Sequence, residues 1–176
     1  MSISANLREQ VRQRARCACE FCGVSEVDVG GELTLDHFQP RSKNGQDNVD
    51  NLLYACTKCN QFKQDYWPCT PESPSLWNPR DVSKPWVELD DGQWIALTPQ
   101  GEFTIQRLRL NRPQLVASRQ RRRQQADAMR LLTHYQDIVL LQAQINQQLV
   151  ALSLEQQALL REQRGLVAVL LKHLWL

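Results

Sequence analysis

Apolar and polar residues alternate in different ways in the two parts of the chain. In the first part, an alternating run over residues 32–38 and an apolar run over 52–55 are typical of short β-strands. Helical spacing predicts a short basic helix over 6–16, and a further helix is expected to begin near Cys56. The order strand, polar loop, strand, helix predicts a small α+β unit.

Turn-forming residues punctuate the middle of the chain. Residues 68–85 hold five prolines and are expected to form an extended connector. Residues 86–97 hold two apolar runs around Asp90-Asp91-Gly92, a pattern that predicts a β-hairpin. Residues 98–101 are expected to form a turn, and residues 103–110 a short helix.

From Asn111 onward, apolar residues keep helical spacing over many turns. Asn111 can cap a helix and Pro113 suits its first turn. Ser153, with Gln156 three residues later, resembles a capping box that would start a second helix. We therefore expect a long helical hairpin, whose glutamine-rich polar face suits coiled-coil packing within the chain, in a homodimer or with a partner protein.

Composition narrows the class of protein. The chain has 176 residues, of which 42% are hydrophobic, enough for a buried core. Its formal net charge is only +2, so any nucleic-acid partner must be bound by local clusters of positive charge. We find neither a secretory signal nor an apolar run of the roughly 20 residues that a membrane span needs. A soluble, cytoplasmic protein is expected.

Four of the six cysteines form two matched pairs. Two residues separate Cys19 from Cys22, and two separate Cys56 from Cys59. In a chain without an export signal, such pairs indicate metal or redox use rather than disulfides. Two tight turns can present four thiolates to one ion, which predicts a closed, structural Zn2+ site.

Other uses of the cysteines stay open at this stage. A redox pair or buried free thiols are the alternatives to zinc, although a redox motif would normally open the first helix of a βαβ unit. Cys17 competes with Cys19 as the first ligand, and the two-residue spacing favours Cys19. Cys69 stands alone among prolines and is expected to take no part.

A dense set of motifs lies between and beside the cysteine pairs. It reads Leu35-Asp36-His37-Phe38-x-Pro40-x-Ser42-x2-Gly45, then Asp50-Asn51-Leu52-x2-Ala55-Cys56-x2-Cys59-Asn60-x2-Lys63. With the first cysteine pair, this stretch resembles the zinc-containing HNH endonucleases over residues 19–63. Residues 77–112 also resemble the tail of bacterial members, whereas the helices after about residue 115 have no counterpart in the resemblance.

The resemblance implies a ββα-metal fold and a role for four residues. His37 would be the general base that activates water, and Asn51 would orient its imidazole. Asp36 and Asn60 would be the protein ligands of one catalytic divalent ion, with Asn60 in place of the final histidine of the motif. Taken singly, each of these residues is as well explained by a turn, a cap or an exposed surface.

The chemistry of phosphodiester hydrolysis suits these residue types. A neutral imidazole can accept a proton from water near neutral pH. One divalent ion held by few oxygen ligands keeps open positions for phosphate oxygens. Hard oxygen ligands favour Mg2+ or Mn2+, and related sites also accept Ni2+, Co2+ or Zn2+.

The resemblance and the patterns give one domain plan. An HNH nuclease domain is expected over residues 1–112, with its zinc-stapled core over 17–67 and a hairpin and short helix over 76–112. Residues 113–176 are expected to form the helical hairpin, a possible coiled coil.

Positive charge is expected to meet the phosphates of double-stranded DNA at two places. Such contacts position a nuclease without reading sequence. The alternative for each cluster is a solvated face. The candidates are Arg41, Lys43, Lys58 and Lys63 near the motif, and Arg119, Arg121, Arg122 and Arg123 at the start of the long helix.

Two further functions compete with a DNA endonuclease. One is a non-catalytic, zinc-stabilised DNA-binding or adaptor module, which needs no role for His37. The other is a nuclease effector of a phage-defence or toxin system, controlled by a partner bound to the long helices. The second shares the proposed chemistry and differs only in its control.

Overall fold

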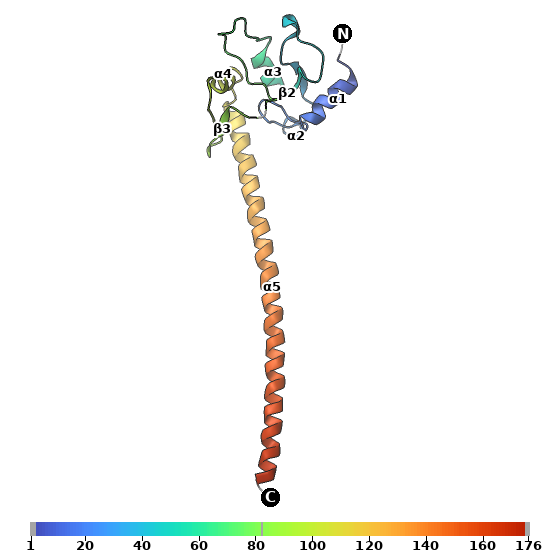
Figure 1. The fold of residues 1–176 in the computed structure, drawn as a ribbon, viewed down its shortest axis with the longest axis vertical. Coiled ribbons are helices and arrows are strands. Elements are labelled where there is room, and N and C mark those ends of the chain that lie inside the picture. Colours follow the sequence, from blue (N-terminus) through green and yellow to red (C-terminus); the bar gives the residue numbers. More distant parts are fainter. Residues whose placement is uncertain (1–2, 82, 175–176) are drawn as a thin grey trace. The chain divides into compact units, whose positions relative to one another are not determined.

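The computed structural model describes residues 3–81 and 83–174. It divides into a first compact unit, Met1–Arg123, and a second unit, Gln124–Leu176. Figure 1 colours the chain from its N-terminus to its C-terminus and labels those elements for which there is room. In chain order, the elements are α1 (Ala5–Arg14), α2 (Glu26–Val29), β1 (Thr34–His37), the 3-10 helix η1 (Arg41–Lys43), β2 (Leu52–Ala55), α3 (Thr57–Lys63), β3 (Trp86–Glu88), β4 (Trp94–Ala96), α4 (Pro99–Arg107) and α5 (Pro113–Leu174).

The strand, loop, strand, helix order predicted for the first part of the chain is confirmed. β1 and β2 form an antiparallel pair in which Asp36 faces Leu53 and His37 faces Leu52. All four residues of β2 are buried, because α1 packs against this strand as well. α3 follows β2 directly and contacts β1. The two last residues of β1 are thus held between a buried strand and a helix.

The predicted second hairpin is also confirmed. β3 and β4 pair antiparallel with Trp86 opposite Ala96, and Gly92 adopts the left-handed φ of +79° that their turn requires. The ring of Trp86 stacks on Trp94 at 5.0 Å and meets Trp77 edge-on at 4.8 Å. These indoles form an aromatic core beside α4.

The turn expected over residues 98–101 is wrong, because α4 begins there. The Thr98 hydroxyl accepts a hydrogen bond from the Gly101 amide at 3.1 Å, and Pro99 occupies the first helical turn. Both residues are as typical of a helix start as of a turn. A Cβ at Gly101 would lie 2.2 Å from the Pro85 carbonyl oxygen, so only glycine permits this approach of the helix.

The helical hairpin predicted for residues 113–176 is wrong. α5 is a single helix of 62 residues that continues through Ser153. Its interior has no proline, and one serine among leucine, glutamine and alanine costs a helix too little to end it. The first compact unit also extends beyond the expected boundary at residue 112, because Leu115 and Arg119 of α5 are buried in it.

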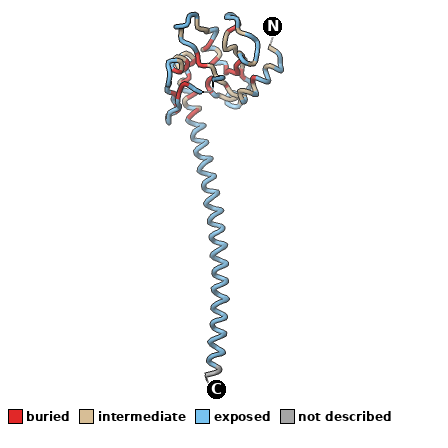
Figure 2. The backbone as a smooth tube through the Cα atoms, in the orientation of Figure 1, coloured by how far each residue is buried: buried red, intermediate tan, exposed pale blue. Residues whose placement is uncertain are grey.

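The two units differ in how far their residues are buried. Every described residue from Gln124 to Leu171 is exposed, and Figure 2 shows the buried positions only in the first unit. The core of that unit includes Val11, Phe21, Leu52, Tyr54 and Leu108. None of the helices described here combines the length and apolar character needed for a membrane crossing.

Candidate metal centre and catalytic site

Four cysteine side chains come together in the first unit. The Sγ atoms of Cys19, Cys22, Cys56 and Cys59 lie within 4.8 Å of one another, and all four residues are buried. Cys22 Sγ and Cys56 Sγ are 3.7 Å apart. A tetrahedral zinc ion with bonds of about 2.3 Å separates its sulfur ligands by roughly 3.8 Å. The donor set and its spacing therefore fit a structural zinc ion.

Local backbone structure creates this arrangement. The Gly23 amide donates to the Cys19 carbonyl at 2.8 Å, with Gly23 at a φ of +76°, which closes the first cysteine turn. Cys56 is the N-cap of α3, and its Sγ accepts from the Cys59 amide at 3.5 Å. Each pair is thus fixed by its own tight turn.

Neighbouring residues complete the centre. Cys17 and Cys69 lie outside the cluster, so the structure brings Cys19 rather than Cys17 to it. An Arg112 guanidinium nitrogen lies 3.9 Å from both Cys56 Sγ and Cys59 Sγ. Its positive charge offsets the charge of thiolates in a buried place.

Asp36 is the third residue of β1, and its carboxylate is largely buried. Its Oδ2 atom has no hydrogen-bond partner, although the Lys63 ammonium lies 3.2 Å away at ion-pair distance. Burial raises the pKa of Asp36, and the charge of Lys63 partly opposes that rise. A carboxylate is the kind of oxygen ligand that a hard divalent ion prefers, although the Lys63 ammonium competes for Oδ2 here.

Asn60 lies on α3, which contacts β1. Its amide nitrogen donates to the Thr34 hydroxyl at 3.3 Å, and that hydroxyl donates to the Ala55 carbonyl at 2.8 Å. Because the nitrogen is engaged by β1, the carbonyl oxygen is the atom left for a metal. A carboxylate oxygen of Asp36 and the carbonyl oxygen of Asn60 are each of the kind that Mg2+ and Mn2+ prefer.

The His37 imidazole is bound by a residue that sequence reasoning missed. Its Nε2 atom lies 2.7 Å from an Asp47 carboxylate oxygen. Arg41 donates to the same carboxylate through Nε at 2.8 Å and through a terminal nitrogen at 2.5 Å. Arg41 first, and His37 second, lower the pKa of Asp47 to about 2. The only signal in the sequence is an acidic residue in a polar loop after the histidine.

The hydrogen bonds of the Asn51 side chain go to the backbone of the loop after β1, so its expected role of orienting the imidazole stays a prediction. This side chain donates to the Gln39 and Gln46 carbonyls, each at 3.0 Å, and accepts from the Gln39 amide at 2.8 Å. It therefore closes the loop that carries Asp47. Gly45 makes this closure possible, because a Cβ there would lie 1.7 Å from the Gln39 carbonyl oxygen.

Two residues expected to contact DNA are buried instead. Lys63 is fully buried, and its ammonium donates to the His37 carbonyl at 2.6 Å. Arg119 is 2% exposed, donates to the Gly92 carbonyl at 2.6 Å and lies over the Trp94 ring. Both side chains are long enough to turn inward, which charge alone does not reveal.

The other expected DNA contacts are exposed. Arg122 and Arg123 also form ion pairs with Glu88 and Asp90, at 3.6 Å and 2.6 Å. Arg41 is held by Asp47 as described above. The exposed residues are Arg41, Lys43, Lys58, Arg121, Arg122 and Arg123.

The fold and the site define a class: a small mixed α/β domain built around a four-cysteine centre suited to zinc. Residues 19–65 match the model of a family described as HNH endonuclease, which confirms the resemblance seen in the motifs and supports a nuclease-type activity in general. The match contains both cysteine pairs, β1, β2 and α3, and ends before β3. A comparison with curated proteins gave no match.

Proposed function

We propose that this protein is a divalent-metal-dependent HNH endonuclease that hydrolyses phosphodiester bonds in DNA. β1, β2 and α3 would form its ββα-metal unit. One observation supports the proposal most strongly. Within the segment that matches the family model, Asp36 and His37 are the last two residues of β1, and Asn60 lies on α3, which contacts that strand.

Each residue has one task in this proposal. Asp36 and Asn60 hold the divalent ion, which would neutralise charge on the phosphate when bound. His37 accepts the proton of the attacking water through its neutral imidazole. The buried Lys63 ammonium donates to the His37 backbone carbonyl and so fixes the end of β1. Asn51 keeps the intervening loop closed.

Cleavage of supercoiled plasmid tests this function. We expect nicking or linearisation with Mg2+ or Mn2+, none with EDTA, and a loss of about 10²- to 10⁴-fold in His37→Ala, because proton transfer to a positioned base contributes that much. His134→Ala is the matched control, since His134 is exposed on α5. Cleavage at the wild-type rate by His37→Ala would contradict the proposal. Metal-independent DNA binding without cleavage would favour the non-catalytic module.

The exposed cations near the site would position DNA through its phosphates. Lys43 and Lys58 are exposed within the motif, in η1 and α3, and Arg121 is exposed on α5. Such contacts add affinity that falls with salt and carry no base readout. If cleavage yields discrete fragments, residues other than these cations must recognise the DNA sequence.

We also propose that the second unit associates with a second copy of this chain. One stripe of large apolar residues on α5 recurs every seven positions, and its members are between 44% and 65% exposed. A heptad stripe of this kind is buried by a partner helix. The stripe consists of Leu131, Ile138, Ile145, Leu152, Leu159 and Leu166.

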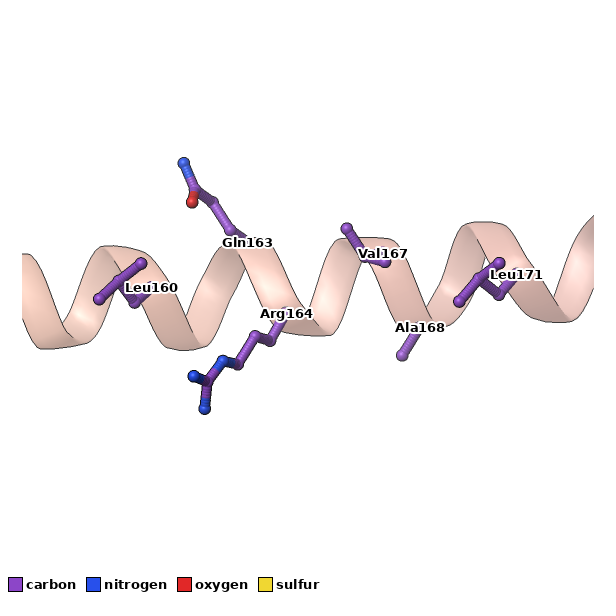
Figure 3. A pocket seen from close by; sticks show the side chains of 6 residues that line it. All are labelled: Leu160, Gln163, Arg164, Val167, Ala168 and Leu171. Atoms are coloured by element: carbon purple, nitrogen blue, oxygen red, sulfur yellow. The ribbon is translucent and has the colours of Figure 1, made fainter.

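The composition beside this heptad stripe favours an identical partner. The adjoining seven-residue series includes Gln142, Gln156 and Gln163 and no charged residue between 128 and 170. Glutamine both donates and accepts hydrogen bonds, so an identical helix meets no repulsion there. The hollow drawn in Figure 3 is lined by α5 residues alone, among them Leu160 and Leu171, and has no second wall to enclose a ligand.

Substitution of one stripe residue tests this association. Ile145→Glu places a charge in the proposed seam and is expected to convert a dimer to a monomer, measured by light scattering during size-exclusion chromatography. Gln147→Glu adds the same charge to the same helix two residues away, outside the stripe, and is expected to remain dimeric. A wild-type protein that is monomeric at high concentration contradicts the proposal.

A further inference from the structure

The pairing of His37 with Asp47 points to a residue that acts through the general base. Asp47 lies ten positions after His37, in the loop between η1 and β2. Its Oδ1 atom is 2.7 Å from Nε2 of the imidazole. The side chain of His37 is only 15% exposed. Nδ1 of His37 has no hydrogen-bond partner among the described residues. The two ring nitrogens are therefore in different environments.

We infer that Asp47 is the positioning residue of the His37 imidazole, a role that rests on the proposed nuclease. An ionised carboxylate only accepts hydrogen bonds, so the imidazole must keep its hydrogen on Nε2. The lone pair is then on Nδ1, the nitrogen that takes the proton from water. When His37 becomes positively charged during that step, the same carboxylate stabilises the charge.

Two features of the loop keep Asp47 in this state. Arg41 binds both carboxylate oxygens, so the carboxylate stays ionised and cannot rotate freely. Asn51 and Gly45 close the loop on its other side. Arg41 faces the carboxylate of the pair, and the Lys63 ammonium binds the backbone carbonyl of the histidine. The Asp36 carboxylate also interacts with the charge of His37. The Asp47 carboxylate therefore binds the positive charge of Arg41 on one side and the His37 imidazole on the other.

Nuclear magnetic resonance of the imidazole tests the pair without any need for cleavage. The full chain contains three histidines, so ¹⁵N-histidine labelling and a His37→Ala spectrum identify the signals of His37. In zinc-loaded protein without added divalent ions, we expect a downfield, slowly exchanging Nε2–H signal. Asp47→Asn should remove it, because the amide accepts through only one oxygen, for which Arg41 competes, and its nitrogen is a donor that cannot accept the Nε2 hydrogen. Asp50→Asn should retain it, since Asp50 pairs with Arg80.

Plasmid cleavage by the same variants gives the second measurement. Loss of the correct tautomer is expected to slow Asp47→Asn by about 10²- to 10⁴-fold, with little change in DNA affinity. Asp50→Asn should cleave at the wild-type rate. A wild-type protein lacking the Nε2–H signal, or an Asp47→Asn variant that keeps both signal and rate, overturns the inference. If no protein cleaves, the proposed nuclease fails, while the spectra still decide whether Asp47 positions His37.

Discussion

Loss of zinc is expected to unfold β1, β2 and α3 while leaving the helix of the second unit intact. The strands have four residues each and α3 has seven, too few to be stable alone. The cysteine cluster joins both ends of this segment in a buried centre. Structural zinc binding contributes about 10–16 kcal/mol in small domains of this kind, which exceeds the stability of most domains.

Hydrogen exchange measured by mass spectrometry locates this effect. In zinc-loaded protein, the β2 amides should be strongly protected because the strand is fully buried. Chelation, or Cys56→Ser, should abolish that protection. Cys69→Ser is the matched control, because Cys69 is exposed and outside the cluster. If the β2 amides stay protected after zinc removal, or if the purified protein holds no zinc, the four cysteines do not form a structural zinc site.

Local patterns predicted most of the secondary structure in the first unit. Residues 52–55 match β2, because an apolar run between a polar loop and a cysteine turn has few other conformations. The four zinc ligands could also be predicted from the sequence, because a turn of a few residues brings the two cysteines of each pair together. Interactions between residues close in the sequence are the ones that a sequence pattern records.

Contacts distant in sequence explain the missed features. The pairing of His37 with Asp47 depends on how a polar loop closes, which Asn51 and Gly45 determine through backbone contacts. The inward turn of Arg119 depends on the β3–β4 turn, whose Gly92 carbonyl it binds. The single long α5 was missed because a capping pattern at Ser153 also fits the interior of a helix.

Lys63 shows why a charged residue near a motif need not contact the substrate. Its position beside a nuclease motif predicted a phosphate contact, yet its side chain has no exposed surface and its ammonium faces Asp36 and the His37 carbonyl. Burial lowers the pKa of Lys63, and the Asp36 carboxylate opposes that change. Each charge therefore depends on the other, because an unpaired charge in the interior is strongly unfavourable.

Removing this ammonium should cost stability rather than DNA affinity alone. Lys63→Met keeps much of the side-chain volume but leaves Asp36 buried without a counter-charge, so we expect a loss of about 3–5 kcal/mol in the free energy of unfolding. Denaturant unfolding of zinc-loaded protein, without added magnesium, measures it. Lys58→Met is the matched control, since Lys58 is exposed on the same helix, and should change stability by no more than about 0.5 kcal/mol.

A double-mutant cycle separates the ion pair from other roles of Lys63. Asp36→Asn removes the partner charge, so Asp36→Asn combined with Lys63→Met should be less destabilised than the sum of the single variants. Additive losses would mean that the two side chains stabilise the fold independently. A Lys63→Met variant with wild-type stability, weaker DNA binding and a smaller salt dependence of that binding would instead show a phosphate contact. The 3.2 Å separation of Lys63 Nζ from Asp36 Oδ2 leads us to expect strong coupling between them.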